Sequence, residues 1–211
     1  MSRIRVMIVD DQPIVRDGLG MILGLCDDME VVYGAGNGEE ALQACVTYAT
    51  DIILMDIRMP IMDGVMATKL IKEKYPSIKI IILTTFNDDE FIFDALKNGA
   101  SSYLLKDMTS DEIINSIKLI YSGGTVLHDN VAAKILNKFT KTDTNNSENQ
   151  MLTPREIELA RLVAEGLSNK EIAQRLYITE GTAKNHITSI LSKLNLSHRT
   201  QLALYVIENK L

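Results

Sequence analysis

The sequence predicts an α/β domain joined to a smaller all-helical domain, and three observations lead to this. Between Arg3 and about Gly123, five short apolar runs alternate with helical patterns, as in a parallel sheet built from right-handed βαβ crossovers. The stretch Thr140–Gln150 then contains no apolar residue, so we interpret it as a linker. Beyond it, apolar residues recur only at helical spacing.

The central element of the first domain is the apolar run Asp51–Met55. Its β-branched residues are typical of a strand that is buried on both faces. The run ends on a single carboxylate, Asp56, and continues into a loop with Pro60 and Gly64. Ligands of open parallel sheets lie at the carboxyl ends of the strands, so chemistry is expected at Asp56. The other predicted strands are Ile4–Val9, Glu30–Tyr33, Lys79–Thr84 and Ser102–Leu105.

Helix starts in this domain are marked by a capping residue followed three positions later by Glu, since each side chain satisfies the other's free amide. The pairs are Asn37 with Glu40, Asn87 with Glu90 and Thr109 with Glu112. The spacing does not give the order of the strands. After His128, Val131–Phe139 could form a short helix before the polar linker.

The last part of the chain predicts four helices. Thr153 caps the first, with Pro154 at its first position, and Gly166 ends it. Ser168 opens a short second helix that ends near Leu176. The remaining two helices are expected from Thr179 to about Leu194 and from about His198 to Asn209. The brief turn Tyr177–Ile178 makes the second and third helices a helix-turn-helix.

Charge and composition narrow the class of protein. The net charge is −6, but Met151–Leu211 carries eight Lys and Arg against six Asp and Glu, whereas the rest of the chain is acidic. This asymmetry indicates a basic module attached to an acidic one. No apolar run approaches the ~18 residues of a membrane span, and the start lacks a signal peptide. Cys26 and Cys45 are interpreted as buried thiols of a cytoplasmic protein.

Acidic, hydroxyl and basic side chains close several of the predicted strands. Asp10 and Asp11 follow the first strand, Thr84 ends the fourth and Lys106 follows the fifth. Carboxylates brought together with Asp56 would repel one another unless a cation relieves them, and oxygen ligands of this kind suit Mg²⁺. Each residue alone could simply be a helix cap or a strand boundary. Together they predict a phosphoryl-transfer site.

These motifs resemble the receiver domain of bacterial response regulators. They are Val9-Asp10-Asp11, Leu54–Pro60 with Asp63-Gly64, Leu83-Thr84-Thr85 and Tyr103-Leu104-Leu105-Lys106. The resemblance covers residues 1–123 and implies a flavodoxin-like (βα)5 fold with strand order 2-1-3-4-5. Where many receivers have Pro after the lysine, this chain has Asp107.

The resemblance implies a role for each residue of the site. Asp56 would accept a phosphoryl group from the phosphohistidine of a sensor histidine kinase. Asp10, Asp11 and Asp56 would hold Mg²⁺ with the Arg58 backbone carbonyl. The phosphoryl oxygens would be bound by Thr84 and Lys106, and Tyr103 would be the aromatic residue that turns inward when Thr84 moves.

The third predicted helix of the second domain has a polar face that could lie in a major groove. Its apolar stripe is Ala183, Ile187, Ile190 and Leu194, and Gly181, Asn185, Thr188 and Ser192 fall opposite, with Lys184 on the flank. Most such faces are only solvated, but the short capped helix beside it and the local positive charge favour DNA binding. His186 lies beside the apolar stripe and is expected to pack within the domain.

Residues 151–211 resemble the LuxR-type helix-turn-helix. The matching motifs are Leu152–Glu156, Gly166–Ala173, Ile178–Ile187 and Lys193-Leu194. The resemblance implies that Lys184, Asn185 and Thr188 lie near base edges, with Thr188 where many relatives carry a longer side chain. It implies phosphate contacts from Thr153, Ser168, Asn169, Lys170 and Thr182. It also implies dimerisation through Leu202, Tyr205 and Val206 of the fourth helix.

Together, the two halves and the linker at 124–150 resemble a NarL/FixJ-type response regulator. Such a protein would be a transcription regulator of double-stranded DNA that forms a homodimer when it is phosphorylated. Three alternative classes of protein fit the sequence less well. A phosphatase with an aspartyl nucleophile needs a second acid where this chain has Arg58. A LuxR-type sensor of small molecules carries a different first domain. A receiver controlled without phosphorylation would not need the filled set of site residues.

Overall fold

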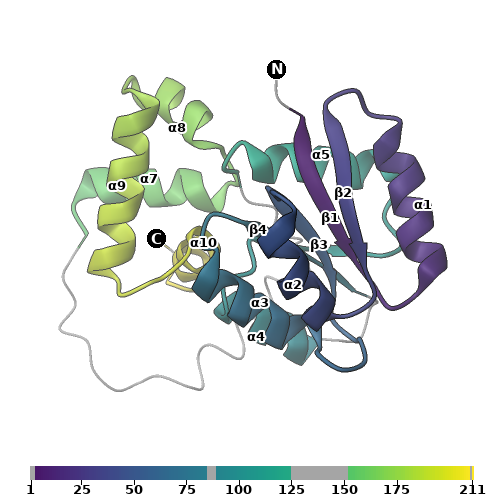
Figure 1. The fold of residues 1–211 in the computed structure, drawn as a ribbon. Helices are drawn as coiled ribbons and strands as arrows, with labels where there is room; N and C mark the ends of the chain where they lie inside the picture. Colours follow the sequence, from purple (N-terminus) through teal and green to yellow (C-terminus); the bar gives the residue numbers. More distant parts are fainter. Residues whose placement is uncertain (1–2, 85–88, 125–151, 210) are drawn as a thin grey trace. The chain divides into compact units, whose positions relative to one another are not determined.

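The computed structural model describes residues 3–84, 89–124, 152–209 and 211. The chain divides into two compact units, Met1–Tyr121 and Ser122–Leu211 (Figure 1). The predicted cap at Asn87, the predicted helix over Val131–Phe139 and almost all of the predicted linker at 124–150 lie outside the described residues.

The first unit is a five-stranded parallel sheet with strand order β2-β1-β3-β4-β5, as the resemblance implied. The strands are β1 (Ile4–Val9), β2 (Met29–Ala35), β3 (Ile52–Asp56), β4 (Lys79–Thr84) and β5 (Ser102–Leu105). The connecting helices are α1 (Pro13–Gly24), α2 (Gly38–Thr47), α3 (Gly64–Lys74), α4 (Asp89–Lys97) and α5 (Ser110–Tyr121). Helices α2, α3 and α4 lie side by side in Figure 1.

Two strands differ from their predicted bounds. Strand β2 is longer than predicted because it pairs along the whole of β1, from Met29 to Ala35. Strand β3 begins and ends one residue later than predicted. Just before it, the Asp51 carboxylate accepts hydrogen bonds from the backbone N–H and the guanidinium of Arg5 at 2.7–2.9 Å. All five residues of β3 are buried, as expected for a central strand.

The predicted caps of α2 and α5 are confirmed in the first unit. Asn37 accepts from the Glu40 N–H at 3.0 Å, while the Glu40 carboxylate accepts from the Gly36 N–H. The Glu112 carboxylate accepts from the N–H and the hydroxyl of Thr109 at 2.8 Å. These caps fix where each helix leaves the carboxyl edge of the sheet.

The second unit contains α7 (Pro154–Ala164), α8 (Asn169–Leu176), α9 (Glu180–Lys193) and α10 (Arg199–Glu208). Capping boxes open α7 at Thr153 and α8 at Ser168, and Thr179 caps α9, all as predicted. Between α8 and α9, Tyr177 has a φ of 54° and a side chain that is 97% exposed. Helix α10 is one residue shorter at each end than predicted.

The core of the second unit corrects the predicted dimer surface. Leu202 is fully buried and Val206 is 4% exposed, because both pack in the cluster that α10 forms with the other helices. Their side chains are therefore unable to cover a second copy, and the prediction for these two residues is wrong. Tyr205 is partly exposed, so a dimer contact there stays a prediction.

Candidate functional site

Three carboxylates converge at the carboxyl edge of the sheet. One oxygen of each of Asp10, Asp11 and Asp56 lies within 4.8 Å of the others. Asp10 follows β1 and is fully buried, Asp56 ends β3 and is 6% exposed, and Asp11 is exposed. Strands β1 and β3 are neighbours in the sheet, which is why residues so distant in sequence meet here. The predicted cluster is thus present, with one side open to solvent.

Lys106 is the cation of this cluster. Its Nζ atom lies 2.8 Å from Oδ2 of Asp10 and 3.1 Å from Oδ2 of Asp56. The Lys106 N–H donates to the Thr84 carbonyl at 2.9 Å, so the ends of β4 and β5 hold the lysine in place. Its side chain is only 16% exposed, and both ion pairs are therefore shielded from water.

Burial and ion pairing shift the pKa values of this pair. Burial raises the pKa of Asp56, and the nearby Lys106 ammonium opposes that rise without cancelling it. For Lys106, burial lowers the pKa, but the hydrogen bond to Asp10 and the charge of Asp56 more than offset it, so its pKa is raised. The lysine therefore stays charged at neutral pH, and the carboxylates retain a demand for further positive charge.

Backbone hydrogen bonds of the loop after β3 fix the position of the Asp56 carboxylate. The Ile57 N–H donates to Oδ1 of Asp56 at 2.9 Å, and the Gly64 N–H donates to the Ile57 carbonyl at 2.9 Å. A Cβ atom at Gly64 would lie 2.0 Å from the Asp56 carbonyl oxygen, so only glycine fits there. Asp63 then caps α3 by accepting from the Met66 N–H. The loop sequence thereby fixes the orientation of the central carboxylate.

The acidic cluster fits a hard divalent cation. Oδ2 of Asp10 is buried, and its partner is the Lys106 ammonium at 2.8 Å. An oxygen with spare lone pairs beside two further carboxylates is what Mg²⁺ binds, together with waters. Among the described residues, the cluster has the composition and closeness that such an ion requires.

The remaining predicted residues of this site are placed as follows. Thr84 is 1% exposed and Tyr103 is fully buried, so the tyrosine ring points inward in this structure. The Arg58 side chain is exposed, and its guanidinium carbon lies 5.6 Å from the centre of the Phe91 ring on α4. Arg58 and Phe91 line a shallow hollow with Ile57, Met59 and Asp63. Sequence reasoning missed Phe91, whose only signal is an aromatic residue near the start of a helix.

Helix α9 presents the predicted polar face. Ala183, Ile187 and Ile190 are buried in the core, whereas Lys184, Asn185 and Thr188 are exposed. The Thr188 hydroxyl donates to the Lys184 carbonyl at 3.0 Å, so its proton is used within the helix. Lysine and asparagine are therefore the side chains of this face best suited to donate to bases.

The predicted phosphate contacts are only partly available. Thr153 and Lys170 are exposed and Thr182 is half-buried. Ser168 is 4% exposed, and its hydroxyl donates to Glu171 at 2.6 Å while accepting from the Glu171 N–H. The Thr153 hydroxyl lies in the same kind of capping box with Glu156. Phosphate contacts at Thr153 and Ser168 both stay predictions.

Asn169 has a structural partner as well. Its Oδ1 accepts from Arg199 at 2.8 Å, and Arg199 also donates to the Leu167 carbonyl. Burial lowers the pKa of Arg199 to about 10, so it still carries its charge at neutral pH. These bonds tie the start of α8 to the start of α10. Because Oδ1 is used in this way, the side-chain amide N–H groups of Asn169 are the donors left for a phosphate contact.

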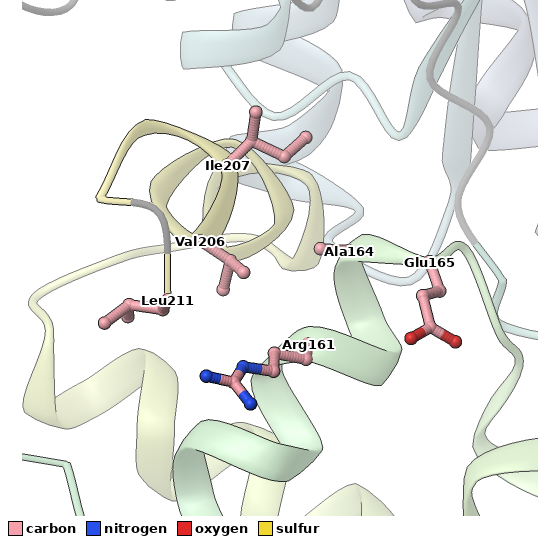
Figure 2. Close-up of a pocket in the computed structure, with 6 residues that line it drawn as sticks. All are labelled: Arg161, Ala164, Glu165, Val206, Ile207 and Leu211. Atoms are coloured by element: carbon pink, nitrogen blue, oxygen red, sulfur yellow. The ribbon is translucent and has the colours of Figure 1, made fainter.

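A shallow hollow lies between α7 and α10, as Figure 2 shows. Its lining is contributed by Arg161, Ala164 and Glu165 of α7, Val206 and Ile207 of α10, and Leu211. The lining is largely aliphatic with one acid and one base, which gives no basis for a specific ligand.

The two units match two families. Residues 6–118 match the response regulator receiver domain, and residues 150–206 match the bacterial regulatory proteins of the luxR family. The chain is 46% identical over 210 residues to the transcriptional regulatory protein LnrK of Bacillus subtilis (strain 168), covering 96% of both chains. It is 43% identical to the transcriptional regulatory protein LiaR of the same organism, covering 99% of both.

Solved structures of response regulators are also similar to this chain. The response regulator ChrA of a haem-sensing two-component system is 32% identical, with a TM-score of 0.56, over 100% of this chain and 99% of that one. The response regulator RcsB in complex with DNA is 25% identical, with a TM-score of 0.58, over 98% and 99%.

The chain therefore belongs to the response regulators that join a receiver domain to a luxR-family DNA-binding domain. Proteins of this NarL/FixJ type regulate transcription by binding DNA and are not enzymes. No helix in the described part of the chain is both long and apolar enough to cross a membrane.

Proposed function

We propose that Asp56 is the phosphoacceptor of this regulator and that a sensor histidine kinase is the donor. A carboxylate oxygen of Asp56 attacks the phosphorus of the phosphohistidine. The new P–O bond forms as the P–N bond breaks, and the imidazole nitrogen leaves with its electron pair. The observation that carries the proposal is the contact of one ammonium, Lys106, with both Asp10 and Asp56 at the strand ends.

Asp10, Asp11 and Asp56 would hold Mg²⁺ together with the Arg58 carbonyl. When bound, Mg²⁺ supplies positive charge that offsets the charge of the phosphoryl oxygens. Lys106 and the Thr84 hydroxyl would bind two of those oxygens. Phosphorylation adds close to two negative charges, which draws both groups toward Asp56. Because the Lys106 N–H is bonded to the Thr84 carbonyl, the ends of β4 and β5 would move together.

In the second unit, we propose that α9 enters the major groove. Lys184 and Asn185 would contact base edges, with Thr188 beside them. Thr153, Ser168, Asn169, Lys170 and Thr182 would contact phosphates. The phosphorylated protein would act as a homodimer on two half-sites, with Tyr205 a candidate contact between the helical units. As a DNA-binding regulator, the protein would act in the cytoplasm.

The domain boundaries are part of the proposal. We assign residues 1–123 to the receiver, 124–150 to a linker and 151–211 to the DNA-binding domain. The compact units Met1–Tyr121 and Ser122–Leu211 support separate domains.

The experiment that tests the proposal is intact-mass measurement and light scattering of the full chain with Mg²⁺ and acetyl phosphate. We expect one added phosphoryl group in the wild type and none in Asp56→Asn. Asp63→Asn is the matched control, because Asp63 is an exposed carboxylate of the same loop and Asn can also cap α3. An Asp56→Asn variant that gains the same mass as the wild type would refute the assignment.

A further inference from the structure

We propose that Thr188 is a specificity-determining residue of α9 that recognises thymine through its side-chain methyl group. The DNA half-site then carries a thymine in the base pair next to the one that Asn185 contacts. This recognition rests on the proposed function, since it requires α9 to lie in the major groove. It adds the chemical feature of the DNA that the helix selects.

The hydroxyl of Thr188 is already engaged within the helix. It donates to the Lys184 carbonyl at 3.0 Å, although the side chain as a whole is exposed. Guanine, adenine and thymine all present acceptors in the major groove, and each acceptor needs a donor from the protein. A hydroxyl whose proton is bonded to the helix backbone does not supply that donor. Thr188 is therefore poorly suited to read these acceptors by hydrogen bonding.

The methyl group is the part of this side chain that is left for the groove. A threonine in a helix divides between two rotamers, and a hydrogen bond from its hydroxyl to the carbonyl four residues earlier selects one of them. With the oxygen held against the Lys184 carbonyl, the Cγ2 methyl is the other heavy atom on Cβ. Thymine is the base that carries a methyl group in the major groove, and apolar contact with that methyl identifies it.

The polar face of α9 is also short enough for a methyl contact. Gly181, Asn185 and Thr188 follow one another at spacings of four and three positions. A Cβ atom at Gly181 would meet only the Thr179 hydroxyl, at 3.9 Å, so packing among the described residues does not require glycine there. A methyl contact needs carbon atoms within about 4.5 Å. The missing side chain at Gly181 lets the helix backbone come that close to the bases.

Asn185 sets the place of the thymine. Its side chain is exposed, and no hydrogen bond among the described residues engages its amide. Asparagine with an open amide pairs in bidentate fashion with adenine. Thr188 lies three residues further on, about 4.5 Å along the helix axis, and neighbouring base pairs are about 3.4 Å apart. The two side chains thus reach neighbouring pairs, and the half-site contains two consecutive A·T pairs.

The test begins with a duplex selected for tight binding to the full chain from a pool of randomised DNA, in the presence of Mg²⁺ and acetyl phosphate. Each thymine of this duplex is then replaced in turn by deoxyuridine, which lacks only the methyl group. Fluorescence anisotropy measures the affinity. At one thymine of each half-site, we expect the wild type to lose about fourfold in affinity, the effect of one buried methyl group of about 0.8 kcal/mol.

Two substitutions separate the methyl group of Thr188 from its hydroxyl. Thr188→Val keeps a methyl and removes the hydroxyl, so it is expected to bind about as tightly as the wild type and still to prefer thymine. Thr188→Ser keeps the hydroxyl and removes the methyl. It is expected to bind the thymine duplex about fourfold more weakly per half-site and to lose the preference for thymine over uracil.

Thr47→Ser is the matched control, because it removes the same methyl group from an exposed threonine at the end of α2 in the receiver. It is expected to leave both the affinity and the preference for thymine unchanged. Thermal melting followed by circular dichroism shows that each variant is folded.

Three outcomes would overturn the assignment of Thr188. The first is a wild type that binds every uracil duplex as tightly as the thymine duplex. The second is an unchanged thymine preference in Thr188→Ser, since deoxyuridine would then act through the shape of the DNA. The third is weak binding by Thr188→Val together with normal binding by Thr188→Ser, because the hydroxyl would then be the group that contacts the base.

Failure of the proposed function gives a different result. If Lys184→Ala and Asn185→Ala both bind the selected duplex as the wild type does, α9 does not read bases and the proposed function is refuted together with the role of Thr188. If those two variants bind weakly while uracil has no effect, α9 reads bases and thymine recognition alone is refuted.

Discussion

The Nζ atom of Lys106 lies 3.1 Å from Oδ2 of Asp56, although β4 stands between the strands that position the two residues. The same atom lies 2.8 Å from Oδ2 of Asp10. One ammonium is thus shared between two buried carboxylates, with Asp11 nearby at the surface. The site remains short of positive charge, which is the physical reason that it suits a metal ion and a phosphoryl group together.

Replacing Lys106 by Met should slow phosphoryl uptake from acetyl phosphate by about 10- to 1,000-fold, because a preplaced donor to the developing charge is lost. It also leaves Asp10 and Asp56 without their cation, so the free energy of unfolding should fall by about 1–3 kcal/mol. Part of that loss should return on adding Mg²⁺. Intact-mass kinetics and urea unfolding measure both effects. The exposed Lys69→Met is the control, and equal uptake rates in the two variants would contradict the role of Lys106.

Gly64→Ala should destabilise the receiver by more than about 2 kcal/mol, since its Cβ atom would clash with the Asp56 carbonyl at 2.0 Å. Gly20→Ala, in a helix position with nothing within 4 Å, should instead stabilise it by about 0.5–1 kcal/mol. Thermal unfolding of the two variants beside the wild type measures the difference. Shifts of the same sign would show that the loop behind Asp56 can relax.

Glu156 should make the stability of the helical unit depend on acid pH. Its carboxylate lies 2.7 Å from Lys193 of α9 and caps α7 at Thr153. The hydrogen bond from Lys193, followed by those from Thr153, lowers the pKa of Glu156. A depressed pKa means that the unfolded chain binds the proton more readily. The stabilisation is therefore complete above the unfolded pKa of about 4.3 and is lost as the pH falls through the folded value.

The measurement is hydrogen exchange of α7 and α9 peptides in the intact chain, followed from pH 7 toward pH 3 after correction for the intrinsic exchange rate. At pH 7, Glu156→Gln should reduce protection by about 1–2 kcal/mol, since the Lys193 side chain is 32% exposed and the pair is partly screened. The gap between the wild type and Glu156→Gln should close at the acid end. A gap of constant size across the range would exclude this carboxylate as the titrating group.

The predicted contacts to phosphates and to bases should differ in how the DNA affinity depends on salt and on DNA sequence. Lys170→Ala should weaken binding to every duplex and lower the slope of log K against log salt by about 0.9. Asn185→Ala should cost about 1–3 kcal/mol on a duplex selected for tight binding and far less on random DNA. Fluorescence anisotropy measures both, with Lys74→Met on α3 as a control for net charge. Equal losses for Asn185→Ala on both duplexes would argue against base readout.

The sequence alone determined the order of the elements and pointed to the residues that meet at the carboxyl edge of the sheet. Alternation of apolar runs with capped helices is a local property, so β3 was found within one residue and the caps at Asn37, Thr109, Thr153 and Ser168 were found at their positions. The residue types at the strand ends likewise point to phosphoryl chemistry before any coordinate is known. The strand order came from the family resemblance, since spacing does not carry it.

Only the tertiary structure decided which residues face solvent and which lie in the core. Leu202 and Val206 have a helical spacing that fits either a core or a surface, and packing against the rest of the helical unit placed them in the core. Ser168 suits a helix cap, and its reciprocal bonds with Glu171 show that it is the cap of α8.

The same holds for Lys106. The sheet likewise had to bring three strand ends together before one ammonium could serve two carboxylates. Local pattern determines what an element is, and packing between distant elements determines what it touches.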